Sequence, residues 1–214
     1  MCSQSEDKKG LASSEAQNDE KALGLHHIKA KDYVQLLNEL ANKVIESRGF
    51  IVLLCGVNGG TNITELNWKN LEVLITHPIL MKDGALHPII LLSLGMLLTR
   101  GKVSDKAELL TEMLQENEDH PIVQRAAFQK FLEGEVVIAF VCIPALASLE
   151  SFPDITEKAR EEIRVWCETM AISLFNNEST LPRDQVKTQL SKEFRFCFKF
   201  EELKTAYRRN RAVD

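Results

Sequence analysis

The sequence has no long hydrophobic run and no excess of basic residues, and each absence excludes a class of protein. Its longest apolar runs, Ile89–Leu98 and Val136–Leu149, fall short of the roughly 20 residues that span a bilayer. We therefore interpret them as buried helices and expect no transmembrane segment. The formal net charge is −5, so no domain-wide basic field is available to neutralise nucleic-acid phosphates. A nucleic-acid partner is not expected.

The cysteines and the N-terminal residues indicate a reducing compartment. The five cysteines are widely spaced and form no C-x-x-C pair, and Met1–Lys9 lacks the apolar core of a signal peptide. Because disulfides form mainly in oxidising compartments, we expect a cytoplasmic protein. Cys2 lies in a polar segment, where acylation could anchor the chain. The other four are expected to be small core residues: Cys55, Cys142, Cys167 and Cys197.

The chain also lacks the motifs of catalysis and phosphate binding. It contains no G-x-S-x-G, H-E-x-x-H or G-x-x-x-x-G-K-[ST] sequence. Three His-Pro-Ile triplets begin at His77, His87 and His120, but their spacing is not that of zinc ligands. Prolines beside helix boundaries explain all three triplets. We expect no enzyme, no metal site and no cofactor.

What is present is a series of helix–loop–helix patterns after a polar start. Residues 1–24 are rich in Ser, Glu, Asp, Lys and Gln, which predicts a disordered tail. From Asp32 apolar residues recur at three- and four-residue steps, as in an amphipathic helix. The Gly- and Asn-rich segment Gly56–Asn62 predicts a loop, and Thr64 is the expected N-cap of the helix that follows.

Two further units follow the same pattern. In the shorter one, Lys82–Leu86 makes a turn and Pro88 opens the next helix, since its missing N–H is not needed in the first turn. In the other, Asp154 begins a capping-box pattern for a helix over Ile155–Phe175. The loop Asn176–Thr180 then leads into another helix.

The segment Ser104–Val136 has the layout of a calcium-binding unit without its ligands. A calcium loop of about twelve residues needs oxygen ligands at alternate positions, a Gly at the sharp turn and a Glu at its end. With Val123 in the hydrophobic eighth place, Glu116 falls at the first ligand position. However, Pro121 takes the place of the Gly and Ala127 that of the closing Glu. The loop therefore predicts the shape of such a unit without its metal.

Four units in series predict an all-α protein of two lobes, residues 25–102 and 103–193, each built from paired units. Short strands could pair between the loops. On this pattern the chain resembles a degenerate member of the EF-hand superfamily, in the style of calcineurin B and neuronal calcium sensors. The run Leu97-Leu98-x-x-Gly101-x-x-Ser104-x-Lys106 is also similar to the EF-hand-like helical region of TLDc proteins. The resemblance implies a non-catalytic adaptor that has lost its calcium ligands.

The resemblance also implies a mode of binding, in which an apolar groove between paired units takes the amphipathic helix of a protein partner. Six apolar residues could line this groove or fill the core, and both roles stay open. They are Leu94, Leu97, Leu98, Phe128, Phe131 and Leu132.

Phenylalanine recurs at every second position near the end of the sequence. We expect residues 194–214 to form a C-terminal tail that is first aromatic and then basic. The four residues are Phe194, Phe196, Phe198 and Phe200. Only an extended strand would place all four on one face. They either close the core or dock to a partner.

Two alternatives to the adaptor remain. The segment Asp119–Ala127 is also typical of the start of an armadillo or HEAT repeat, although the sequence has no steady period of about 40 residues. The chain would then be an α-solenoid scaffold. The second alternative is a genuine calcium sensor, which full ligand loops would have indicated.

Overall fold

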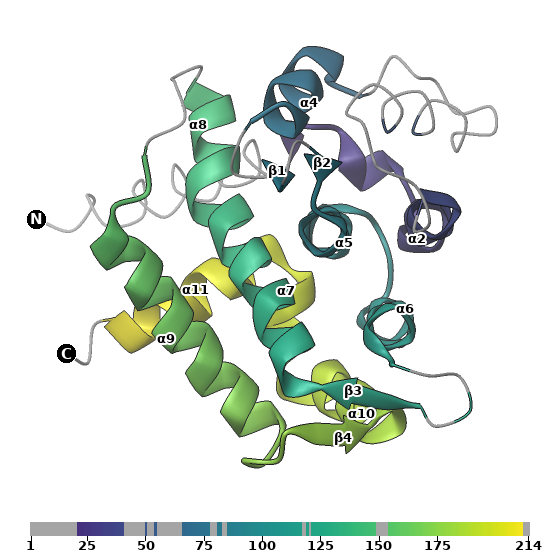
Figure 1. Cartoon of the computed structure of the whole chain (residues 1–214). Coiled ribbons are helices and arrows are strands. Elements are labelled where there is room, and N and C mark those ends of the chain that lie inside the picture. The colour runs from purple at the N-terminus through teal and green to yellow at the C-terminus, as the bar shows by residue number, and fades with distance from the viewer. Residues whose placement is uncertain are drawn as a thin grey trace, which may run out of the picture.

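The computed structural model describes residues 21–40, 50, 54, 66–77, 81–82, 85–116, 119, 121–148 and 154–211, and these residues are mostly helical (Figure 1). The helices are η1 Leu25–His27, α2 Ala30–Leu40, α4 Trp68–Ile75, α5 Pro88–Leu98, α6 Val103–Leu114, α7 Arg125–Val137, η4 Ile138–Cys142, α8 Ile143–Ser148, α9 Glu157–Leu174, α10 Arg183–Lys192, η5 Arg195–Phe198 and α11 Phe200–Arg211. The strands are β1 Met81–Lys82, β2 Ala85–Leu86, β3 Ile122–Gln124 and β4 Thr180–Pro182. Strand β1 pairs with β2 and β3 with β4, both antiparallel. The predicted all-α character is confirmed.

The helix starts follow local capping chemistry. Pro88 opens α5 as predicted, and the Nδ1 atom of the N-cap residue His87 accepts a hydrogen bond from the Ile89 N–H at 3.3 Å. Helix α9 is capped by Thr156, whose hydroxyl accepts from the Ala159 N–H at 3.2 Å. The prediction of Asp154 as the cap was wrong, because the helix begins two residues later than a cap at that position requires.

Helix α4 also begins at a side-chain cap. Its N-cap is Asn67, whose side chain accepts a hydrogen bond from the Asn70 N–H at 3.2 Å. The predicted cap Thr64 and the predicted loop Gly56–Asn62 lie outside the described residues.

Helix α5 lies at the centre of the molecule. It is apolar on all sides, and every residue from Leu91 to Leu98 is buried, which is typical of a helix that is surrounded by other helices. Glycines permit two close crossings. A Cβ on Gly95 would lie 2.1 Å from the Tyr33 ring of α2, and a Cβ on Gly134 of α7 would lie 2.6 Å from the Ser93 Oγ. Both crossings therefore depend on the missing side chain.

Helices α7, η4 and α8 form one continuous rod, along which α9 packs (Figure 1). Residues 138–142 make a single π-helical turn directly ahead of Pro144. Proline cannot donate an intrahelical hydrogen bond, and a π-turn is one way in which a helix accommodates such a defect. The proline is therefore accommodated by a local change of pitch, and the helix continues to Ser148.

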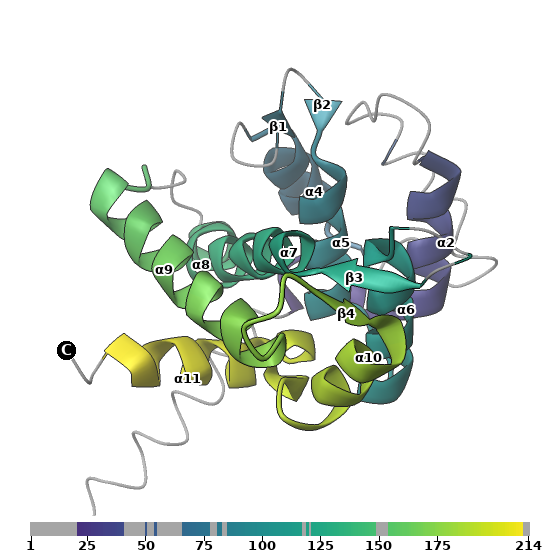
Figure 2. The same cartoon turned by 60° about the horizontal axis from the view of Figure 1, so that its bottom comes forward.

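The chain segment after α10 is part of the fold. Figure 2 shows α11 running beneath the rod and α9, and α11 packs against α7 and η4. The predicted C-terminal tail, residues 194–214, is therefore folded over residues 194–211, and residues 212–214 lie outside the described residues.

One hydrophobic core extends through the described residues, from Leu23 to Tyr207. Helix α5 of the predicted first lobe packs against α7 of the predicted second lobe, so the described parts of the two lobes share a core across the boundary at residue 102. Leu23, at the end of the predicted tail, is fully buried. Residues 1–20 of that tail lie outside the described part. None of the described helices combines the length and the apolar character needed to cross a membrane.

Candidate functional site

Two helix–loop–helix units are joined through their loops. One unit consists of α6, β3 and α7, and the other of α9, β4 and α10. In the antiparallel pair of β3 and β4, Val123 lies opposite Leu181. The Arg125 N–H donates to the Ser179 carbonyl oxygen at 2.9 Å just beyond the strands. Short strand pairing between these loops is thus present, as the sequence had suggested.

Ion pairs fix α10 to α6 on the other side of the strand pair. The Arg183 guanidinium contacts the carboxylates of Glu108 and Glu112, the latter at 3.1 Å, and Lys187 also pairs with Glu108. Hydrogen bonds from Lys187 and Arg183 lower the pKa of the Glu108 carboxyl. The first helix of one unit and the last helix of the other are therefore held together.

Neither loop has the sequence of a complete set of calcium ligands. In the first, the Glu116 carboxylate accepts a hydrogen bond from the Gln124 side chain. In the second, counting back from Leu181 as the eighth place of a calcium loop, the first ligand position falls on Leu174, which is fully buried, and the closing position on Gln185. Within the described part of the chain, no three His, Cys, Asp or Glu side chains gather as a metal site requires.

The six candidate groove residues lie in the core. Each is at most 1% exposed, so in this structure they offer no surface to a partner. They are Leu94, Leu97, Leu98, Phe128, Phe131 and Leu132. Of the two roles left open by the sequence, the core role describes their position.

The four phenylalanines of residues 194–200 do not form a strand. The segment makes the short helix η5 and then begins α11, so the prediction of an extended conformation was wrong. Phe194, Phe198 and Phe200 are nevertheless between 1% and 6% exposed, while Phe196 is half-buried with its ring 6.2 Å from that of Trp166. Burial does not alternate along the segment, because Cys197 between Phe196 and Phe198 is also fully buried, as the three residues per turn of η5 allow.

Helix α11 covers the interior of the joined units with its apolar face. Tyr207 is 5% exposed, and its ring lies 4.9 Å from that of Phe140 and 5.1 Å from that of Trp166. The Arg208 guanidinium lies 5.6 Å from the Phe140 ring centre. The interior that a partner helix would need is therefore occupied by a helix of the chain itself.

Glu135 of α7 is an ionisable side chain inside the core. It is fully buried, and neither carboxyl oxygen has a hydrogen-bond partner among the described residues. Burial disfavours the charged form and raises the pKa of this carboxyl well above its usual range, while the charge of Lys106 acts in the opposite direction. Burial thus favours the neutral form of Glu135.

The described cysteines are buried free thiols, as predicted: Cys142, Cys167 and Cys197. Burial raises the pKa of Cys142 to about 12 and raises that of the other two as well. Because the thiolate is the nucleophile, burial disfavours the reactive form of these thiols. Cys55 lies outside the described residues.

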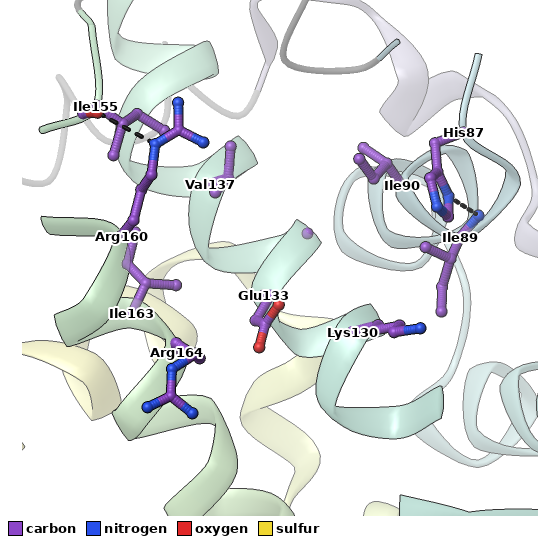
Figure 3. A pocket seen from close by; sticks show the side chains of 11 residues that line it. His87, Ile89, Ile90, Lys130, Glu133, Val137, Ile155, Arg160, Ile163 and Arg164 are labelled. Atoms are coloured by element: carbon purple, nitrogen blue, oxygen red, sulfur yellow. Dashed lines mark hydrogen bonds between the residues drawn. The ribbon is translucent and has the colours of Figure 1, made fainter. Parts of the chain in front are cut away.

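A cleft of about 380 Å³ opens between the start of α5, the middle of α7 and the first half of α9 (Figure 3). Its walls are mainly aliphatic, and charged groups stand among them. The lining residues are His87, Ile89, Ile90, Lys130, Glu133, Gly134, Val137, Ile155, Arg160, Ile163 and Arg164.

The charged groups of the cleft differ in the ion pairs and hydrogen bonds that they already form. Arg164 is engaged by Glu161 at 2.6 Å and by Glu168 at 3.1 Å. Arg160 uses only Nε, which donates to the Ile155 carbonyl oxygen at 3.2 Å. Glu133 accepts a hydrogen bond from the Gln129 side chain at 3.0 Å.

The sequence did not reveal this cleft. Its walls come from residues 87–90, 130–137 and 155–164, three segments that only the packing of α5 and α9 against α7 brings together. The triplet at His87 was interpreted as a helix boundary, which is correct but incomplete.

Comparison of the chain with protein-family models, with curated proteins and with solved structures finds no match.

Proposed function

We propose that the chain is a non-catalytic protein-interaction module, built on an EF-hand-like pair of helix–loop–helix units that works without calcium. The observation that carries the proposal is the antiparallel pairing of β3 with β4, with Val123 opposite Leu181. Paired calcium-binding units join through the hydrophobic eighth places of their loops, and here that contact occurs between loops without full ligand sets. The same pairing favours this arrangement over an α-solenoid, in which stacked helices need no strand between loops.

The proposed mode of binding is the recognition of an amphipathic helix. Helix α11 supports it, because its buried residues Phe200, Leu203 and Tyr207 already lie against the joined units. A partner helix would make the same kind of contact after displacing α11. Because no metal opens the interior in this proposal, competition between α11 and the partner helix determines how often the partner is bound.

We predict that calcium does not bind. Titration calorimetry of the full chain with millimolar calcium should give no saturable heat, while a calcium-sensor EF-hand protein in the same buffer serves as the positive control. Pro121 and Ala127 stand where the Gly and the closing Glu of a calcium loop belong. A dissociation constant in the roughly micromolar range of sensors would contradict this prediction and favour the sensor alternative.

Capture of associated proteins tests the adaptor role. The tagged full chain is purified from its native cells in calcium and in EGTA, beside the variants Tyr207→Ala, which loosens α11, and Val165→Ala. Val165 is 48% exposed on α9 and serves as the control.

We expect one stoichiometric protein in both buffers, in larger amount with Tyr207→Ala and in unchanged amount with Val165→Ala. A synthetic Phe200–Arg211 peptide should compete with it. If no stoichiometric protein is recovered from any variant, the adaptor role is wrong.

A further inference from the structure

We propose that the cleft between α5, α7 and α9 is a binding site for a small aliphatic carboxylate, in which the carboxylate is held by Arg160 and the hydrocarbon chain lies over Val137 toward Ile89. The proposal does not rest on the adaptor role. Its argument uses the lining, the size and the charge of the cleft.

The lining selects an aliphatic ligand. The apolar residues in the walls are isoleucine and valine, and Ile89, Ile90, Val137 and Ile155 are all partly exposed toward the cleft. No Phe, Tyr or Trp stands among the described lining residues, so His87 carries the one ring in this part of the walls. The described lining also contains no Ser, Thr, Asn or Gln, so the hydroxyl groups of a sugar would find few neutral polar partners there.

The size of the cleft limits the length of the chain. At about 380 Å³ it lies near the lower end of the roughly 300–1,000 Å³ range of small-molecule sites. This favours a single short hydrocarbon chain over a branched lipid.

Two basic side chains of the cleft favour an anionic head group. Arg164 is neutralised by Glu161 and Glu168, which leaves Lys130 and Arg160 without a carboxylate partner among the described residues. Glu133 is the one carboxylate among the described lining residues. These charges balance over the cleft and its rim, so the cation that a ligand can reach is local, at the side chains of Arg160 and Lys130.

The positions of the charges place the head group at Arg160. Figure 3 shows Arg160 and Lys130 on opposite sides of the cleft, with Val137 and Glu133 between them. The Nη groups of Arg160 form no hydrogen bond within the described residues, and a guanidinium can hold a carboxylate through two parallel hydrogen bonds. On the Lys130 side, Glu133 would repel the same group.

Calorimetric titration of the full chain with decanoate, below its micellar concentration, tests the proposal. Decylammonium and decanol are titrated beside it. We expect saturable binding of one decanoate, weaker binding of decanol and no binding of decylammonium. Arg160→Glu should weaken decanoate binding at least about tenfold, since hydrogen bonds to charged groups contribute more than 1.4 kcal/mol.

Lys158→Glu is the matched control, because this side chain is 88% exposed on the same helix and does not line the cleft. It should leave binding unchanged. Val137→Phe, which fills the cleft without altering its charge, should abolish binding. Circular dichroism melts establish that each variant is folded, and Arg160→Gln replaces the charge reversal if that variant unfolds.

Three results would overturn the proposal: no saturable binding of decanoate by the unaltered protein, equal weakening by Arg160→Glu and Lys158→Glu, or equal affinity for decylammonium. None of them depends on the outcome of partner capture, so the two proposals fail separately.

Discussion

Glu135 is the residue at which burial and charge oppose each other inside the core. Its carboxyl is fully buried without a hydrogen-bond partner among the described residues, and its pKa is raised well above the usual value of 4.5. The folded state therefore binds a proton that the unfolded state releases above that value. Stability must fall as the pH rises from about 4.5 toward the folded pKa.

We predict that Glu135→Gln stabilises the protein at pH 8, because the amide keeps the shape of the acid without its ionisation. The gain should shrink toward pH 5, where the unfolded carboxyl also begins to take up a proton. Urea denaturation at both pH values measures it.

Glu108→Gln gives the opposite sign, which makes it a suitable control. The pKa of Glu108 is lowered, so its contribution to stability is present above the unfolded pKa and is lost as the pH falls through the folded pKa. This variant should be less stable than the unaltered protein at pH 8. A Glu135→Gln variant that also loses stability at pH 8 would show that the buried carboxyl is charged and paired.

Two of the phenylalanines near the C-terminus differ in burial, so their replacement tests whether the segment belongs to the core. Phe198 is 4% exposed, so Phe198→Ala should cost about 3–5 kcal/mol of unfolding free energy. Phe196 is half-buried, and Phe196→Ala should cost clearly less. Urea denaturation of both variants provides the values. If Phe198→Ala left stability unchanged but abolished partner capture, the docking interpretation would replace the core one.

At the scale of elements, the pairing of β3 with β4 joins two helix–loop–helix units that come from different parts of the sequence. Val123 and Leu181 occupy the middle positions of the two strands. A double-mutant cycle of Val123→Ala and Leu181→Ala should give a coupling energy of about 0.5–1 kcal/mol. The same cycle between Val123→Ala and the exposed Val73→Ala on α4 should be additive. Additivity in both cycles would show that the strands contribute no pairwise energy.

Sequence reasoning was accurate where the structure is governed by local periodicity. The helical step of three and four residues predicted α2, and the assignment of Val123 as the apolar residue of its loop agrees with its full burial. It failed where the backbone changes direction within a few residues. The alternating phenylalanines indicated a strand, because alternation cannot distinguish an extended chain from a short helix that is followed by a turn into another helix.

The cleft could not be predicted for a different reason. Its depth comes from the angle and spacing at which α5 and α9 meet α7, and Gly134 permits the close approach of α5. Such packing geometry depends on residues far apart in the sequence. The isoleucines that line the cleft are locally indistinguishable from those of a core.

At the scale of the whole molecule, the shared core predicts a single unfolding transition. The two tryptophans report on the two predicted lobes, Trp68 from α4 and Trp166 from α9. In the Trp68→Phe and Trp166→Phe variants, the fluorescence of the remaining tryptophan and the far-ultraviolet circular dichroism should change at the same urea concentration. Separate midpoints within one variant would show that the lobes unfold independently.

Synthesis on the ribosome proceeds from the N-terminus, so α11 emerges after every described element that it covers. Until then the apolar rings of Phe140 and Trp166 lack the Tyr207 ring that packs against them in the finished protein. Nascent chains with exposed apolar surface are prone to aggregation. The two rings therefore stay without this aromatic cover until the last described helix has left the ribosome.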